Sequence, residues 1–131
     1  MAESAFEIAL ARIVMELDDG DTVGVALTGS HARGDPTDYS DVDVLRFVQC
    51  LPEQEGDRYR LEVRDGHLFS VTTTTVAEKT GELTRPEKAI WAVPGLRQAR
   101  VLLDKEGSLA ELKLEADDFS WGRFDRLPMS T

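Results

Sequence analysis

The sequence predicts an α+β fold in which helices and strands follow one another without a regular repeat. An amphipathic helix opens the chain, a short apolar run typical of a buried strand follows, and two β-prone runs meet at Asp65-Gly66. At 131 residues, of which 41% are hydrophobic, the chain has the size of one domain with one core. We therefore expect a single domain over residues 1–131.

The first elements lead to the part of the chain that carries chemistry. Apolar residues recur at helical spacing over residues 3–17, with Ser4 as the cap. Residues 23–27 are almost all apolar and predict a buried strand that ends at Gly29-Ser30. Residues 31–33 predict a helical turn, residues 37–40 a loop, and residues 41–48 a second strand.

The remaining elements complete the sheet. Residues 58–64 and 67–76 predict two strands joined by a tight turn, because Asp-Gly suits the positive backbone angles of a hairpin. A helix is predicted from Pro86 to Trp91, closed by Pro94-Gly95. A short strand over residues 100–103 and a helix carrying Leu109 and Leu112 come last.

The charge and the apolar runs exclude several classes of protein. Twenty-five acidic residues against fifteen basic ones give a net charge of −10, which repels a phosphate backbone and excludes non-specific nucleic-acid binding. A nucleoside triphosphate is not excluded, because magnesium supplies local positive charge. No apolar run approaches the roughly 20 residues of a membrane-spanning helix. With the single cysteine Cys50 and no leader, we expect a cytoplasmic protein.

Two short motifs combine into a candidate site. Gly29 and Ser30 stand where a strand gives way to a helical turn, a position whose free backbone N–H groups bind phosphate. Asp41 and Asp43 are two apart on a predicted strand, so both carboxylates project from one face and suit a hard cation. Either motif alone is also typical of an ordinary cap or a solvated strand start. Their order along the chain makes chance coincidence a poor explanation.

The stretch over residues 24–45, GVALTGSHARGDPTDYSDVDVL, closely resembles the signature of the polymerase-β-like nucleotidyltransferase superfamily, most of all its small bacterial, aminoglycoside-type branch. The resemblance implies a mixed twisted sheet with helices mainly on one face. It implies that Gly29 and Ser30 bind a nucleoside triphosphate, with Arg33 as a further contact. It also implies that Asp41 and Asp43 hold two Mg²⁺ ions, or Mn²⁺ in their place, for nucleotidyl transfer with release of pyrophosphate.

The family adds a third carboxylate from a neighbouring strand, and Glu62 is the candidate for this catalytic, metal-binding position. Its alternation with Arg60 and Arg64 equally fits a solvent face of paired charges. If the third position falls on the next strand instead, it is occupied by Ser70 or Thr72, neither of which is a good metal ligand. Both interpretations stay open at this point.

The acceptor side is less defined. Larger relatives continue into a helical acceptor-binding domain, which we expect this chain to lack. The acceptor is then a hydroxyl of a small aminoglycoside-like molecule or of a protein. The alternative hypothesis is a catalytically degenerate interaction module, such as an antitoxin-like partner of a helical toxin. A homodimer would complete a half-built cleft, and a helical protein would be the partner of the interaction module. The sequence places His31 and His67 in exposed turns, and Trp91 and Trp121 in packing.

Overall fold

A computed structural model describes residues 5–34, 41–64 and 66–121 of the chain. The predicted loop over residues 37–40, the Ser4 cap and Asp65 of the hairpin turn lie outside these ranges. The core of the fold is a five-stranded sheet in the order β3-β4-β2-β1-β5. Its strands are β1 (Thr22–Thr28), β2 (Val42–Val48), β3 (Tyr59–Arg64), β4 (His67–Thr74) and β5 (Arg100–Asp104).

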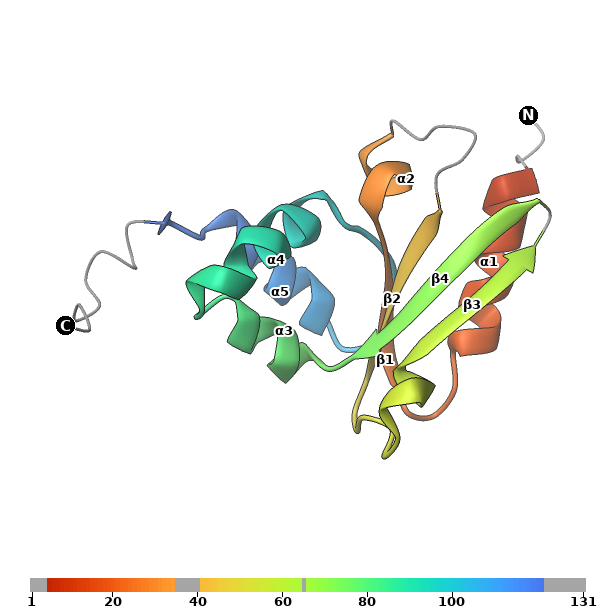
Figure 1. Cartoon of the computed structure of the whole chain (residues 1–131), viewed down its shortest axis with the longest axis horizontal. Coiled ribbons are helices and arrows are strands. Elements are labelled where there is room, and N and C mark those ends of the chain that lie inside the picture. Colours follow the sequence, from red (N-terminus) through yellow and green to blue (C-terminus); the bar gives the residue numbers. More distant parts are fainter. Residues whose placement is uncertain (1–4, 35–40, 65, 122–131) are drawn as a thin grey trace.

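Helices cover both faces of this sheet. Figure 1 shows α1 on one side and α3, α4 and α5 on the other, with α2 at the end of β1. The helices are α1 (Ala5–Leu17), α2 (Gly29–Arg33), α3 (Val76–Glu82), α4 (Pro86–Gln98) and α5 (Ser108–Asp117), with a 3₁₀ turn, η1 (Glu55–Arg58), before the hairpin. No helix in the described ranges is long and apolar enough to span a bilayer.

The sheet is mixed, as the family resemblance implies. β2 and β4 run parallel, whereas β1 pairs antiparallel with β2 and β5, and β3 pairs antiparallel with β4. Because side chains alternate along a strand and directly paired residues share a face, the register assigns every residue of β2, β3 and β4 to one of two faces. We call the side covered by α1 the α1 face and the opposite side the α4 face.

Each face has its own hydrophobic core. On the α1 face, Val42, Val44 and Phe69 pack with Leu10 and Ile13 of α1, and all five are almost fully buried. On the α4 face, Phe47 packs with residues of α4 and α5, including Val93 and Leu112. Burial of one such large side chain contributes about 1.5–3 kcal/mol. The two cores therefore pack against both faces of the sheet and fix the positions of the strand ends.

Two local predictions are corrected. The strand predicted to reach residue 76 ends at Thr74, and α3 follows because the Thr75 side chain caps it by accepting a hydrogen bond from the Glu78 N–H at 3.1 Å. Helix α4 does not stop at Pro94 but continues to Gln98. Pro94 removes the hydrogen bond to the carbonyl of Ile90, and both residues are exposed, so that carbonyl remains accessible to water.

Candidate active site

Gly29 and Ser30 begin helix α2 directly after the central strand β1. Thr28 is still extended at the cap position, and Gly29 then takes the left-handed backbone angle φ 70° that turns the chain into the helix. Ser30 is half-buried within this turn. The turn ends at Gly34, which is also left-handed at φ 81°. Sequence and structure agree on a strand that gives way to a short helical turn at the glycine-serine pair.

Asp43 packs against the bare Cα of Gly29. A Cβ added at Gly29 would lie 2.4 Å from Asp43 Oδ2, closer than van der Waals contact allows. Asp43 is half-buried in β2 and is paired with Thr28 of β1, while Asp41 stands exposed just before β2 begins. Glycine is thus required at position 29 twice, for its backbone angle and for the carboxylate beside it.

The parallel pairing of β2 with β4 decides which residues face Asp43. Asp43 pairs with Ser70, and Ser70 pairs with Leu61, so these three side chains lie on the α4 face. Thr72 is two residues further along β4 and shares that face. The positions next to Asp43 on the neighbouring strand are therefore hydroxyl residues, as the second sequence interpretation describes.

Glu62 lies on the opposite face of the sheet. It pairs with Phe69, which pairs with Val42, and both of these are buried in the α1-face core. The arrangement does not bring Glu62 to Asp41 and Asp43 and does not support it as their shared metal ligand. Within the described ranges, no group of three or more acidic, histidine or cysteine side chains is placed to hold a metal.

Glu62 instead belongs to a set of ion pairs on the α1 face. Its carboxylate contacts Arg60 at 2.5 Å and Arg64 at 2.9 Å. Arg64 also bonds Glu16 of α1, and this hydrogen bond lowers the pKa of the Glu16 carboxyl while raising that of Arg64. These contacts join the hairpin to α1. The alternating charges of β3 thus form a paired outer surface.

His31 and His67 take part in packing, contrary to the exposed positions expected from sequence. Phe6 of α1 stacks on His31 of α2 with ring centroids 4.8 Å apart, and it meets His67 of β4 edge-on at 5.4 Å. Both histidines are half-buried. This aromatic contact connects α1 to the glycine-serine turn. The side chain of Arg33, the further predicted nucleotide contact, lies outside the described part of the structure.

A hollow beside the glycine-serine turn contains residues that the sequence analysis did not assign to a site. Its volume is about 170 Å³, and its lining includes Thr28, Leu45, Lys79 and Trp91. Leu45 follows Asp43 by two residues on the α4 face, so the hollow adjoins the carboxylate. The Trp91 side chain is 80% exposed, which corrects the expectation that it anchors packing.

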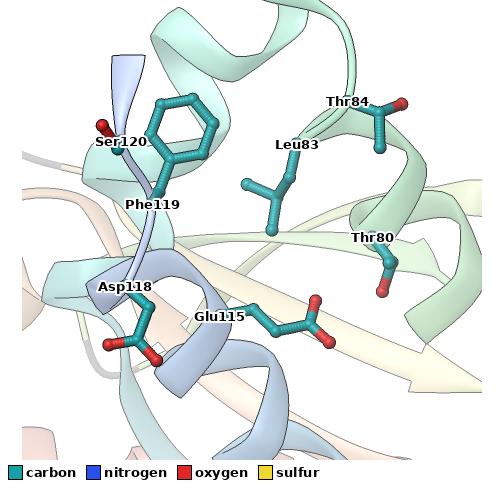
Figure 2. Close-up of a pocket in the computed structure, with 7 residues that line it drawn as sticks. All are labelled: Thr80, Leu83, Thr84, Glu115, Asp118, Phe119 and Ser120. Atoms are coloured by element: carbon teal, nitrogen blue, oxygen red, sulfur yellow. The ribbon is translucent and has the colours of Figure 1, made fainter. Parts of the chain in front are cut away.

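A separate hollow of about 380 Å³ lies between α3 and the end of α5. Figure 2 shows Thr80 and Leu83 on the α3 side of it and Glu115 and Phe119 on the α5 side. None of the predicted site residues contributes to its lining. Trp121 meets Phe119 edge-on at 4.8 Å nearby, although its side chain is 47% exposed.

Comparison with known proteins decides the family. The sequence pattern of the nucleotidyltransferase domain family matches residues 8–92, which include all of α1 from Ile8, the glycine-serine turn, both aspartates and the hairpin. The chain belongs to this family. It is therefore a polymerase-β-like nucleotidyltransferase domain, as its sequence predicts.

Two relatives are informative. Over 41 residues the chain is 42% identical to a putative protein adenylyltransferase of Methanocaldococcus jannaschii, an overlap of 31% of this chain and 28% of that protein. A crystal structure of a nucleotidyltransferase-like protein from Exiguobacterium sibiricum is similar with a TM-score of 0.59 and 17% identity, covering 89% of this chain and 40% of that one. The similarity to this crystal structure supports the fold of the chain. The chain spans less than half the length of either relative.

Proposed function

We propose that this domain transfers a nucleoside monophosphate from a nucleoside triphosphate to a hydroxyl group and releases pyrophosphate. The observation that carries the proposal is the contact between Asp43 and Gly29, because it holds a carboxylate against the turn that would bind phosphate. Membership of the nucleotidyltransferase family and the partial likeness to a putative adenylyltransferase support the same chemistry.

The glycine-serine turn would hold the triphosphate. The first backbone N–H groups of α2 have no partner inside the helix, and the side chain of Thr28 at the cap position does not bond them. Such groups bind phosphate oxygens, and the Ser30 hydroxyl adds a further donor. In the reaction the acceptor oxygen bonds to the α-phosphorus while the bond from that phosphorus to the bridging oxygen breaks. Pyrophosphate leaves with the electron pair, and the hydroxyl loses its proton.

The residues present fit a magnesium ion bound together with its substrate. Magnesium prefers oxygen ligands and is usually held by one or two carboxylates plus substrate phosphates and water. Asp41 and Asp43 would supply the carboxylates, and the glycine at position 29 leaves room that any other residue would fill. When bound, magnesium neutralises charge on the phosphate oxygens. Asp41 and Asp43 are thus proposed to hold metal and triphosphate in one place.

A second candidate function is an interaction module that has the nucleotidyltransferase fold but catalyses no reaction. The observation that favours it is that Ser70 and Thr72, rather than carboxylates, stand beside Asp43 on the neighbouring strand. A site with fewer acidic ligands binds magnesium more weakly in the absence of substrate phosphates. Such a module would bind a partner, for example a helical protein, without transferring a nucleotide.

Titration calorimetry with ATP and magnesium tests the proposal. We expect magnesium-dependent heat of binding for the natural sequence and none for Asp41→Asn or Asp43→Asn. Asp117→Asn, an exposed change at the end of α5, is the matched control and should bind as the natural sequence does. Absence of binding across a panel of triphosphates, or equal binding by the Asp43→Asn variant, would contradict the proposal.

A further inference from the structure

A basic cleft stands out on this acidic protein. It has a volume of about 400 Å³ and lies between the β3–β4 hairpin and the beginning of the α3–α4 pair. Four cationic side chains and two carboxylates contribute to its lining, although the whole chain carries a net charge of −10. The lining residues of interest are Arg58, Lys79, Arg85, Lys88, Glu78 and Glu82.

The two carboxylates of the cleft are already neutralised. Arg58 forms an ion pair with Glu78, and Lys79 contacts Glu82 at 3.1 Å. The side chains of Arg85 and Lys88 form neither an ion pair nor a hydrogen bond with any residue in the described ranges, and both are exposed. The cleft therefore has two cations in excess, and their potential attracts a ligand of opposite charge.

An apolar strip adjoins the cleft on the same face of the sheet. Tyr59, Leu61 and Val63 are 56%, 69% and 72% exposed on the edge strand β3. Tyr59 also lines the cleft. Leu61 pairs with Ser70 of β4, and Ser70 pairs with Asp43 of β2, so the three residues lie in one row across the sheet. Exposed apolar side chains grouped on one surface are typical of an interaction site. The strip leads from the cleft toward the aspartates along the α4 face.

We propose that the cleft and the strip together bind a protein acceptor through a segment that carries acidic residues beside apolar ones. The acidic residues would pair with Arg85 and Lys88, and the apolar ones would cover Leu61 and Val63. A cationic small molecule, such as an aminoglycoside, would be repelled by the cleft. Charge complementarity of this kind sets partner choice and association rate. The docking of this segment is inferred from the charge of the cleft and the exposed apolar strip. Modification of the docked segment rests on the proposed transferase function.

A short fluorescent peptide in which glutamates alternate with leucines around one tyrosine is the probe. We expect it to bind the full chain at low ionic strength and the matched peptide with lysines in place of the glutamates to bind poorly. Arg85→Glu should weaken binding about fivefold or more, and the loss should shrink as salt is added. Arg12→Glu, an exposed arginine on α1, is the matched control.

The apolar strip is tested in the same assay. Leu61→Ser should weaken binding of the glutamate peptide, whereas Leu114→Ser should not, although Leu114 on α5 is exposed to a similar extent at 61%. Circular dichroism confirms that each variant folds. Equal binding of the two peptides, or an equal effect of the test and control substitutions, would overturn the docking proposal.

Triphosphate binding separates this inference from the proposed function. Arg85→Glu should leave magnesium-dependent ATP binding unchanged, because neither the glycine-serine turn nor the two aspartates contribute to the lining of the cleft. If that variant loses ATP binding, the cleft belongs to the nucleotide and the docking proposal is wrong. If the peptide binds as expected while no triphosphate binds, docking stands and the transferase function fails.

Discussion

Asp43 and Glu62 are both half-buried carboxylates on strands of the same sheet, yet their surroundings differ completely. Asp43 lies on the α4 face against a glycine at the start of a helical turn. Glu62 lies on the α1 face between Arg60 and Arg64, and Arg64 in turn bonds Glu16. One carboxylate is held beside a candidate phosphate site, and the other is held by cations of its own strand.

The difference shows how a strand register determines the chemistry of an acidic residue. A side chain on β3 changes face with every residue, so a displacement by one position would have put Glu62 beside Ser70. As folded, its neighbours satisfy its charge and join the hairpin to α1. A carboxylate that already forms ion pairs with two arginines binds a metal weakly, because the metal would have to displace both arginines.

Replacing the two carboxylates separately gives the largest expected contrast. Asp43→Asn should lower the affinity for ATP with magnesium by about 100-fold or more, because metal contacts contribute several kcal/mol. Glu62→Gln should keep that affinity within about twofold of the natural sequence. Titration calorimetry of both variants checks the contrast. A comparable loss in Glu62→Gln would restore Glu62 to the site.

Gly29→Ala compared with Gly34→Ala sharpens the geometry around Asp43. Both glycines are left-handed, so each alanine should cost about 1–2 kcal/mol of stability. Only at position 29 does the added Cβ meet Asp43, at 2.4 Å, whereas at position 34 no atom of the described residues lies within 4 Å. We therefore expect the affinity of Gly29→Ala for ATP to be about tenfold lower than that of Gly34→Ala. Equal affinities in the two variants would show that the Asp43 contact is dispensable.

Ser70→Asp would place a carboxylate directly beside Asp43. We expect it to tighten binding of Mg²⁺ or Mn²⁺ alone by up to about tenfold, since hard cations gain from each added carboxylate. Without metal, the variant should melt earlier because like charges on paired positions repel. Leu61→Asp, one strand further on the same face, serves as the comparison in a thermal-shift titration and should show no gain. The same gain in both would mean that the effect is not local.

The smallest effect concerns Glu78, which resembles Glu62 in having an arginine partner. Burial raises the pKa of Glu78, but hydrogen bonds from Thr74 and Arg58 outweigh it and hold the pKa below its ordinary value of 4.5. A carboxyl whose pKa is lowered in the folded state stabilises the fold at pH values above its ordinary pKa. This contribution is lost as the pH falls through the lower pKa of the folded state. Glu78→Gln should therefore destabilise by about 1 kcal/mol or less at pH 7.

Urea unfolding at several pH values measures the Glu78 effect. The difference between the natural sequence and Glu78→Gln should shrink as the pH is lowered below 4.5, where the native carboxyl becomes protonated. A difference that stays constant from neutral to acidic pH would mean that the side chain acts through its shape alone.

Local signals were sufficient to predict much of this fold. The apolar run of β1, the Asp-Gly hairpin and the glycine-serine turn each depend on neighbouring residues, and the structure has all three. Helix α3 was missed although its start has a local mark, since Thr75 and Glu78 have the spacing of a capping box. The run of threonines before it favoured a longer strand and hid that mark.

The face occupied by Glu62 could not be predicted from sequence. Arg60, Glu62 and Arg64 alternate in the same way whether the strand turns them toward a site or toward α1. The choice depends on the pairing of β4 with β2, a contact between residues far apart in the chain. The exposed position of Trp91 has the same origin, because it follows from how α4 packs on the sheet.

The place of β5 in the sheet has a consequence for synthesis of the chain. β1 is buried almost throughout, yet one of its two hydrogen-bonding edges is completed only by β5, which is made much later. Until residues 100–104 leave the ribosome, that edge of a highly apolar strand has no partner and can pair with other chains. Nascent chains that stall before Arg100 are therefore expected to aggregate, whereas those that include β5 complete the sheet.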